Sequence, residues 1–136
     1  MRRIRLDSNV LVAAFVSRGL CADVLRLILR DYDLVIPEVV ADEVRQVLLR
    51  KLRFSEKAFM AVEAVLDRCE IAPRGTDPSP VSVRDADDER VLADALSAGV
   101  QMLITGDGDL LAVAAESPIP ILSPRAFLTL ARGGTF

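Results

Sequence analysis

Short apolar segments alternate with longer helical patterns along the chain, and this alternation restricts the fold more than any other feature. Apolar runs of four or five residues, such as QMLIT (101–105), are separated by stretches with helical spacing. Strands that alternate with helices in this way predict parallel β-α-β units. We therefore expect an α/β fold, a three-layer α/β/α sandwich with a parallel sheet, formed by one domain over residues 1–136.

Turn and capping residues separate the expected elements. Pro37 and Pro124 are suited to the first turn of a helix, Ser123 to an N-cap, and Gly99 to a helix end. The expected strands are 4–9, which runs into a polar turn, 34–37, 70–73, 101–105 and 119–122. Two expected helices are centred on 24–29 and 59–66. Four others cover 38–52, 88–99, part of 106–116, and 124–132. Residues 74–83 form a proline-containing loop, and no motif suggests a role for it.

The composition indicates a compact protein without a membrane segment. Hydrophobic residues make up 51% of the chain, which is enough for a sizeable core. No apolar run reaches the roughly 20 residues of a membrane span, and the basic N-terminus is not followed by the apolar segment of a signal peptide. Cys21 and Cys69 lie in apolar helical patterns, so we expect buried free thiols and a cytoplasmic location.

The charged residues restrict the chemistry further. The chain contains no histidine, which excludes Ser-His-Asp and Cys-His mechanisms and histidine-bound metals. Hydrolysis would therefore have to depend on carboxylates. Arginine accounts for 15 of the 17 basic residues, which favours phosphate contacts or simply reflects genome composition. The net charge of −3 argues against binding nucleic acid by bulk positive charge.

Acidic residues follow two of the predicted strands. Asp7 ends the first strand, and Asp107 and Asp109 follow 101–105. In doubly wound sheets, ligands bind at the carboxyl ends of strands near the switch in strand order. If the strand order is 3-2-1-4-5, these two strands are neighbours and their acids converge.

Two further acids share a helix face with apolar residues. At about 100° per residue, Glu43 falls beside Val40 and Val44, and Asp88 falls near Ala95. Burying an unpaired carboxylate is costly, so both are expected to share a partner. In the stretch DADDERVLADA (85–95), Asp85 is expected to be the helix N-cap and Glu89 to face solvent.

Each acid alone has an ordinary structural explanation as a helix cap or an ion-pair partner. Together, three regions that this fold would bring close to one another each supply an acid, and we expect no basic residue inside these motifs. The excess negative charge therefore predicts a cation. Carboxylate and water ligands favour Mg²⁺ or Mn²⁺ over zinc, and the residues leave open whether one or two ions bind.

These motifs resemble those of PIN-domain proteins. The similarity is carried by DSNVLVAAF, PEVVADEV and DADDERVLADALSAGVQMLITGDGDLL, and extends from Ile4 to about Leu128. The closest group is the VapC-like toxins of toxin–antitoxin modules. The resemblance implies the strand order 3-2-1-4-5 and a metal-dependent endoribonuclease that leaves 5′-phosphate and 3′-hydroxyl ends.

The resemblance also assigns site residues and partners. The catalytic acids would be Asp7, Glu43, Asp88 and Asp107. The ligands of a Mg²⁺ or Mn²⁺ ion would be Asp7, Asp88, Asp107 and Asp109, supported by Asn9, Thr105 and Asp87. The implied partners are an RNA substrate, a cognate antitoxin protein and a second copy of the chain in a homodimer.

Three other classes of protein could carry acids at these positions. A non-catalytic RNA-binding or protein-interaction module could use the same scaffold, although the complete set of acids argues against it. An aspartate-based phosphatase would need a second aspartate where DSN has Asn9. A phospho-receiver domain would need a lysine after a late strand, and the only lysines are Lys51 and Lys57.

Overall fold

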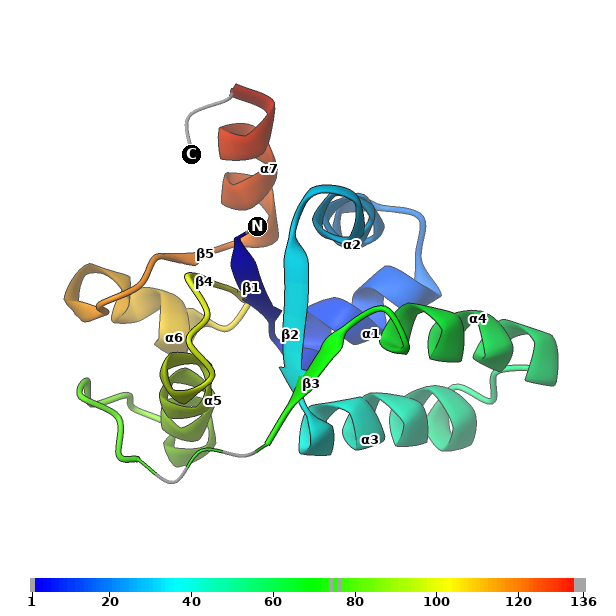
Figure 1. The fold of residues 1–136 in the computed structure, drawn as a ribbon, viewed down its shortest axis with the longest axis horizontal. Helices are drawn as coiled ribbons and strands as arrows, with labels where there is room; N and C mark the ends of the chain where they lie inside the picture. Colours follow the sequence, from blue (N-terminus) through cyan, green and yellow to red (C-terminus); the bar gives the residue numbers. More distant parts are fainter. Residues whose placement is uncertain (1, 74, 76, 134–136) are drawn as a thin grey trace.

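The computed structural model describes residues 2–73, 75 and 77–133. Its five strands form one parallel sheet in the order β3-β2-β1-β4-β5 (Figure 1). The strands are β1 (Arg3–Leu6), β2 (Asp33–Pro37), β3 (Glu70–Ala72), β4 (Met102–Ile104) and β5 (Ile121–Leu122). The predicted α/β fold and its strand order are confirmed. β1 lies at the centre, where the strand order changes direction.

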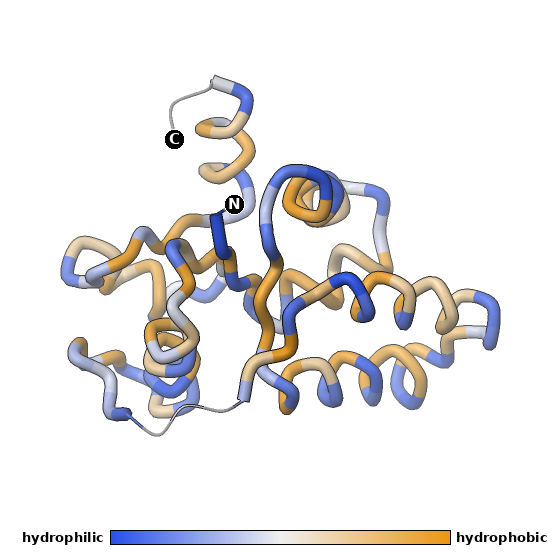
Figure 2. The backbone as a smooth tube through the Cα atoms, viewed as in Figure 1, coloured by the Kyte–Doolittle hydropathy of each residue, from blue (hydrophilic) through white to orange (hydrophobic). Residues whose placement is uncertain are grey.

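Helices pack on both faces of the sheet. One group contributes to the main hydrophobic core with Ile4, Leu6 and Ile104: α1 (Ser8–Val16), α2 (Leu20–Asp31), α3 (Glu38–Gln46), α4 (Glu56–Leu66) and α7 (Pro124–Gly133). The opposite face packs against α5 (Ala86–Ser97) and α6 (Gly108–Ala112). Figure 2 shows the expected amphipathic character of α3. Its hydrophobic residues face the rest of the molecule, and its hydrophilic residues face outward. Burial of these apolar faces drives the assembly of the three layers.

The central strand presents arginine to the α5 side of the sheet. Arg5 occupies a position there that Leu103 fills on β4, and Arg3 lies on the same face, in register with Asp33 of β2. The apolar contacts on this side therefore form two separate clusters, one containing Leu103 and the other Val35. Arg3 forms an ion pair with Glu70 at 2.5 Å and remains partly exposed, whereas Arg5 is buried.

The structure contains one helix that the sequence analysis missed. Helix α1 follows β1 after a single residue, and Asp7 is its N-cap. The apolar residues of VLVAAFV (10–16) do not leave a polar face, so the segment lacks the amphipathic period by which the other helices were recognised.

Several element boundaries also differ. The predicted helix 38–52 divides into α3 and a π-helical turn, η1 (Val47–Lys51). Helix α5 begins two residues earlier than predicted, at Ala86. The segment after β4 forms the short helix α6 and a 3₁₀ turn, η2 (Ala114–Glu116). Of the loop 74–83, Arg74 and Thr76 lie outside the described residues.

The two cysteines are free, as expected, but they are half-buried rather than fully buried. Cys69 lies in the turn between α4 and β3, where its thiol donates a hydrogen bond to the Val65 carbonyl. Burial raises the pKa of this thiol to about 11, so it is protonated at neutral pH. Within the described part of the chain, every helix is too short or too polar to cross a membrane.

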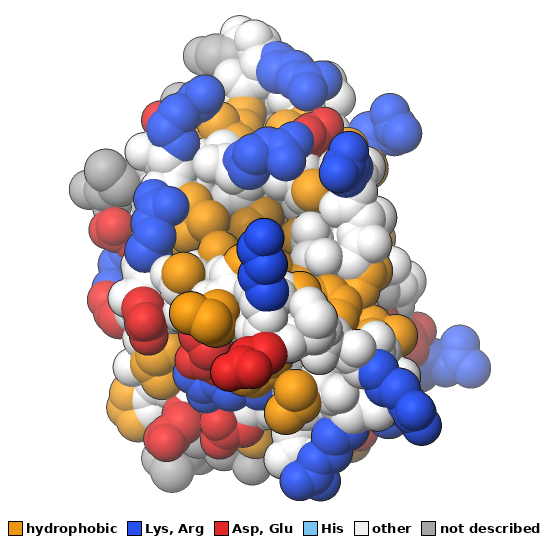
Figure 3. Space-filling model, turned by 90° about the vertical axis from the view of Figure 1, so that its right-hand side faces the viewer, with side chains coloured by type: hydrophobic (Ala, Val, Ile, Leu, Met, Phe, Trp, Pro, Cys, Tyr) orange, Lys and Arg blue, Asp and Glu red, His pale blue; other side chains and the backbone are white. Residues whose placement is uncertain are grey.

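Large apolar side chains are exposed on the part of the molecule that carries the turn between α3 and α4. Leu49, Leu52 and Met60 are 47%, 46% and 67% exposed. Figure 3, viewed from the right-hand side of Figure 1, shows apolar side chains exposed at the surface between Lys and Arg side chains. Isolated exposed apolar residues are common, but a group of them is typical of a surface that contacts another protein.

Candidate metal centre

A cavity of about 380 Å³ lies at the carboxyl ends of the central strands, where the strand order changes direction. Six acids and two arginines line it: Asp7, Glu43, Asp87, Asp88, Asp94, Asp107, Arg5 and Arg90. The acids come from the end of β1 and from α3, α5 and the start of α6. The fold therefore brings together four acids that the sequence analysis singled out at widely separated positions.

Asp7 is the most firmly held of these carboxylates. It is 7% exposed, and its two oxygens have different partners. Oδ1 accepts a hydrogen bond from the Ser8 amide at 2.9 Å, as the N-cap of α1. Oδ2 accepts one from the Thr105 hydroxyl at 2.8 Å. Both bonds fix the orientation of a carboxylate that is nearly enclosed.

Asp107 begins the next helix in a similar way. Its Oδ1 accepts hydrogen bonds from the amides of Asp109 and Leu110, at 2.8 and 3.2 Å, and caps α6. Its own amide donates to Thr105 Oγ1 at 3.0 Å. The fully buried Thr105 therefore contacts both strand-end acids, which is consistent with the supporting position expected for it.

Asp88 faces these strand-end acids from α5. One carboxylate oxygen from each of Asp88, Asp107 and Asp109 lies within 4.8 Å of the other two. Partial burial and the neighbouring Asp107 carboxylate raise the pKa of Asp88 to about 6, and Asp85 and Asp7 add to this effect. Three carboxylates this close repel one another, and they offer only oxygen donors. They are therefore a suitable donor set for Mg²⁺ or Mn²⁺.

The remaining predicted residues lie at the rim of the cavity. Glu43 lines it from α3 but is exposed, so the prediction that its helix phase would bury it was wrong. The start of α3 stands at the cavity mouth, where a residue on the inner side of the helix still reaches solvent. Asn9 and Asp87 also line the cavity and are exposed.

The helix phase was also wrong for Glu89. Asp85 caps α5 as expected, accepting hydrogen bonds from the amides of Asp87 and Asp88 at 2.8 and 3.3 Å. Glu89, which was expected to face solvent, is half-buried and accepts a hydrogen bond from the Val83 amide at 3.0 Å. The loop before α5 folds back over the helix, and a single-helix projection does not include that contact.

The sequence analysis missed three charged residues of the cavity. Arg5 and Asp94 are buried, and Asp94 accepts a hydrogen bond from Arg90 Nε at 3.0 Å. The expectation that no basic residue lies within the motifs was therefore wrong, because Arg5 is two residues from Asp7 and Arg90 two from Asp88. A charged residue inside the short apolar strand IRL was the available signal.

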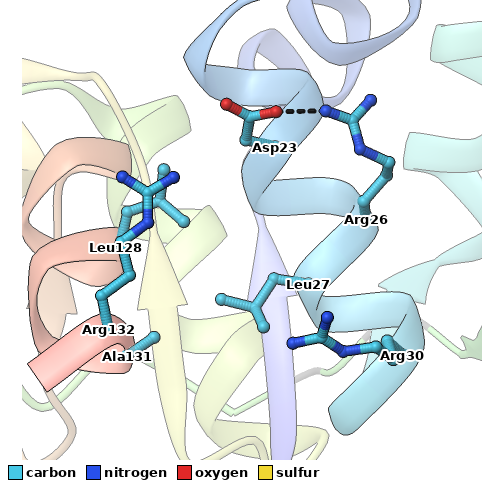
Figure 4. Close-up of a pocket in the computed structure, with 7 residues that line it drawn as sticks. All are labelled: Asp23, Arg26, Leu27, Arg30, Leu128, Ala131 and Arg132. Atoms are coloured by element: carbon cyan, nitrogen blue, oxygen red, sulfur yellow. Dashed lines mark hydrogen bonds and ion pairs between the residues drawn. The ribbon is translucent and has the colours of Figure 1, made fainter. Parts of the chain in front are cut away.

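A larger cavity, of about 620 Å³, lies elsewhere, between α2 and α7 (Figure 4). It is lined by Asp23, Arg26, Leu27, Arg30, Leu128, Ala131 and Arg132. Two of its three arginines already have acidic partners, Arg26 with Asp23 and Arg30 with Asp31. This cavity has a single carboxylate, so it lacks the donor set of the acidic cavity.

Solved structures with the same fold include toxin–antitoxin proteins. The DNA-bound VapBC of Salmonella typhimurium is 17% identical over 91% of this chain and 99% of that chain, with a TM-score of 0.60. VapC20 of Mycobacterium tuberculosis, a toxin that cleaves the sarcin–ricin loop, is 15% identical over 81% and 94%, with a TM-score of 0.57. VapBC2 of Rickettsia felis, bound to a promoter DNA fragment, is 17% identical over 88% and 96%, with a TM-score of 0.56.

A search of curated protein sequences finds no significant match. A family model does match, and it covers most of the chain. The model describes the PIN domain and aligns with residues 3–109, a range that holds every strand-end and helix acid described above. The chain belongs to the PIN-domain family.

Proposed function

We propose that this protein is a Mg²⁺- or Mn²⁺-dependent endoribonuclease and the toxin of a toxin–antitoxin module. One observation carries the proposal: one carboxylate oxygen from each of Asp88, Asp107 and Asp109 lies within 4.8 Å of the other two, and Asp88 and Asp107 line the same cavity as Asp7. Membership of the PIN family and a fold shared with VapC proteins support it. Hydrolysis of a phosphodiester bond needs little more from a protein than positioned charge.

In this proposal, Asp7, Asp88, Asp107 and Asp109 hold the ion, with Glu43 completing the acidic set from the cavity mouth. A bound divalent ion would supply charge stabilisation at the phosphate and an activated water for in-line attack, leaving 5′-phosphate and 3′-hydroxyl ends. With a pKa of about 6, the Asp88 carboxyl is mostly ionised at neutral pH, as a metal ligand must be. Asn9 and Asp87, both exposed at the rim of the cavity, would support the ligands from outside.

The backbone hydrogen bonds of the site provide preorganisation. Asp7 and Asp107 each cap a helix, and Thr105 contacts both. Their carboxylates are therefore oriented before any ligand arrives, and less conformational freedom is lost on binding. Hydrogen-bonding partners that orient the ligands of a metal are typical of sites whose activity depends on the exact positions of those ligands.

We also propose an antitoxin partner and a homodimer in a cytoplasmic protein. Two of the similar solved structures are VapBC assemblies bound to DNA. The exposed side chains Leu49, Leu52 and Met60 offer apolar area for a protein partner (Figure 3). Residues 1–136 would form one PIN domain, because Phe127 of α7, beyond the family match, packs in the main core against Tyr32.

The direct test is incubation of the purified protein with total RNA in Mg²⁺, Mn²⁺ or EDTA, followed by sequencing of the new ends. We expect internal cleavage with either ion, none in EDTA, and 5′-phosphates on the products. Asp7→Asn should be inactive under all conditions. Cleavage that persists in EDTA contradicts metal dependence. Binding of RNA without cleavage in any condition would instead favour a non-catalytic module.

A further inference from the structure

Arg5 is the most unusual charged residue of the protein. It is 2% exposed, at the centre of the sheet, and its Nε and Nη1 atoms are sealed from solvent without a hydrogen-bond partner. Arg3, on the same face of β1, instead has its own carboxylate partner in Glu70. A buried charge without a dedicated partner is costly, so it is expected where its charge acts on a site.

Arg5 lies on one side of the acidic cavity. The acids whose negative charge acts on its guanidinium are Asp7, Asp94 and Glu43. Asp94 already has Arg90 as an ion-pair partner at 3.0 Å, whereas Asp7 and Glu43 have no ion pair within the described residues. The acids of the cluster, Asp88, Asp107 and Asp109, are not among those that act on Arg5, and none of them has an ion pair within the described residues either.

Arg5 therefore offsets part of the negative charge of one set of acids, Asp7 and Glu43, whereas no basic side chain is paired with Asp88, Asp107 and Asp109 within the described residues. We infer that Arg5 is a built-in cation that takes the place of a second metal ion, so that the centre binds one divalent ion per chain, at Asp88, Asp107 and Asp109 with Asp7. The inference rests on the proposed metal centre and specifies its stoichiometry.

Electrostatics supports this division. In two-metal sites the ions lie about 3.5–4 Å apart and share a carboxylate between them. The acids available to a second ion here are Asp7, which it would share with the first ion, and Glu43, and both act on the charge of Arg5. A second dication would be placed beside a guanidinium that burial prevents from moving into solvent. Repulsion between like charges in a poorly solvated site disfavours that arrangement.

The test counts bound ions rather than activity. Metal-free protein is titrated with Mn²⁺ by calorimetry, and the saturated sample is examined by electron paramagnetic resonance. We expect one ion per chain and the spectrum of an uncoupled ion. Arg5→Met, which keeps the length but removes the charge, should bind two ions and show spin coupling between them. Arg26→Met, at an exposed arginine of the cavity between α2 and α7, is the matched control and should still bind one.

Two bound ions in the unchanged protein overturn the inference and leave the proposed nuclease intact, since a two-ion centre also cleaves phosphodiesters. One ion in folded Arg5→Met overturns it as well. If Arg5→Met does not fold, the numbers of ions bound by Arg5→Gln and by the unchanged protein decide whether the inference holds. Absence of any bound Mn²⁺ contradicts the metal centre of the proposed function itself, and the inference falls with it.

Discussion

The hydroxyl of Thr105 donates a hydrogen bond of 2.8 Å to Oδ2 of Asp7 and so connects the ends of two adjacent strands. The Asp7 amide donates to the Ile104 carbonyl at 3.0 Å, which extends the pairing of β1 and β4 to the edge of the cavity. The same Thr105 oxygen accepts a hydrogen bond from the Asp107 amide at 3.0 Å. One buried side chain therefore fixes the positions of two proposed metal ligands.

Replacing Thr105 by valine should lower both metal affinity and cleavage. Valine has nearly the same shape but leaves Asp7 Oδ2 and the Asp107 amide without this partner. Loss of a residue that orients a ligand typically costs about 10–100-fold in affinity or activity. We expect a decrease of that order in the initial cleavage rate and in Mn²⁺ affinity, with destabilisation of about 1–3 kcal/mol.

Thr129→Val is the matched control, because Thr129 is exposed on α7 and its hydroxyl bonds only to the Arg125 carbonyl one turn earlier. It should leave rate, affinity and melting temperature close to those of the unchanged protein. Equal rates for the two variants would show that Thr105 does not orient the site.

Asp7→Asn should abolish cleavage while the protein stays folded. The amide oxygen can still accept from Ser8 and cap α1, but the negative charge is lost from the centre. Asp31→Asn provides the comparison, since Asp31 is exposed at the end of α2 and pairs only with Arg30. Initial rates on one RNA at saturating Mn²⁺, with circular dichroism spectra, measure both effects. Substantial activity in Asp7→Asn would remove Asp7 from the proposed ligands.

Two neighbouring acids of α5 should behave in opposite ways. Asp88→Ala is expected to lose cleavage by orders of magnitude without loss of metal-free stability, because it removes one of three close carboxylates. Glu89→Ala should retain cleavage but lose about 1–3 kcal/mol of stability, because the Val83 amide loses its acceptor. Rates and thermal melts of both variants in parallel test this pair. If Glu89→Ala is the inactive variant, the proposed ligand set must be revised.

The metal-free protein should show a pH dependence that originates from Asp88. Its pKa is raised from 3.8 to about 6, so the folded state favours the protonated carboxyl. The stability from this group is fully present below about pH 4 and is lost as the pH rises through about 6. In EDTA, the melting temperature of the unchanged protein should therefore fall further and further below that of Asp88→Asn as the pH rises over that window.

Saturating Mn²⁺ should reverse this order, because the ion binds the ionised carboxylate and stabilises the folded state by linkage. The measurement is a series of thermal melts of both proteins between pH 4 and 7.5, with and without the ion. Parallel curves in EDTA would contradict the raised pKa, and curves that Mn²⁺ does not shift would contradict the metal centre.

The fold class and the region where the acids meet could be predicted from the sequence. Alternating strands and helices indicate the parallel sheet, and Asp7 and Asp107 are recognisable because each lies just beyond the carboxyl end of a buried strand. Periodicity succeeded where helices are amphipathic. It missed α1, whose apolar residues leave no polar face, because that helix is identified by its packing and its cap rather than by its period.

Only the tertiary structure decided how each charge of the cavity is compensated. Glu43 is exposed and Glu89 half-buried because the cavity mouth and the loop before α5 lie next to their helices, and a projection of one helix contains neither. Arg5 of β1 and Asp94 of α5 line the same cavity only because the fold brings that strand and that helix close together. Secondary structure follows from local spacing, whereas the energy of a charge depends on neighbours that are distant in sequence and become close only when the chain folds.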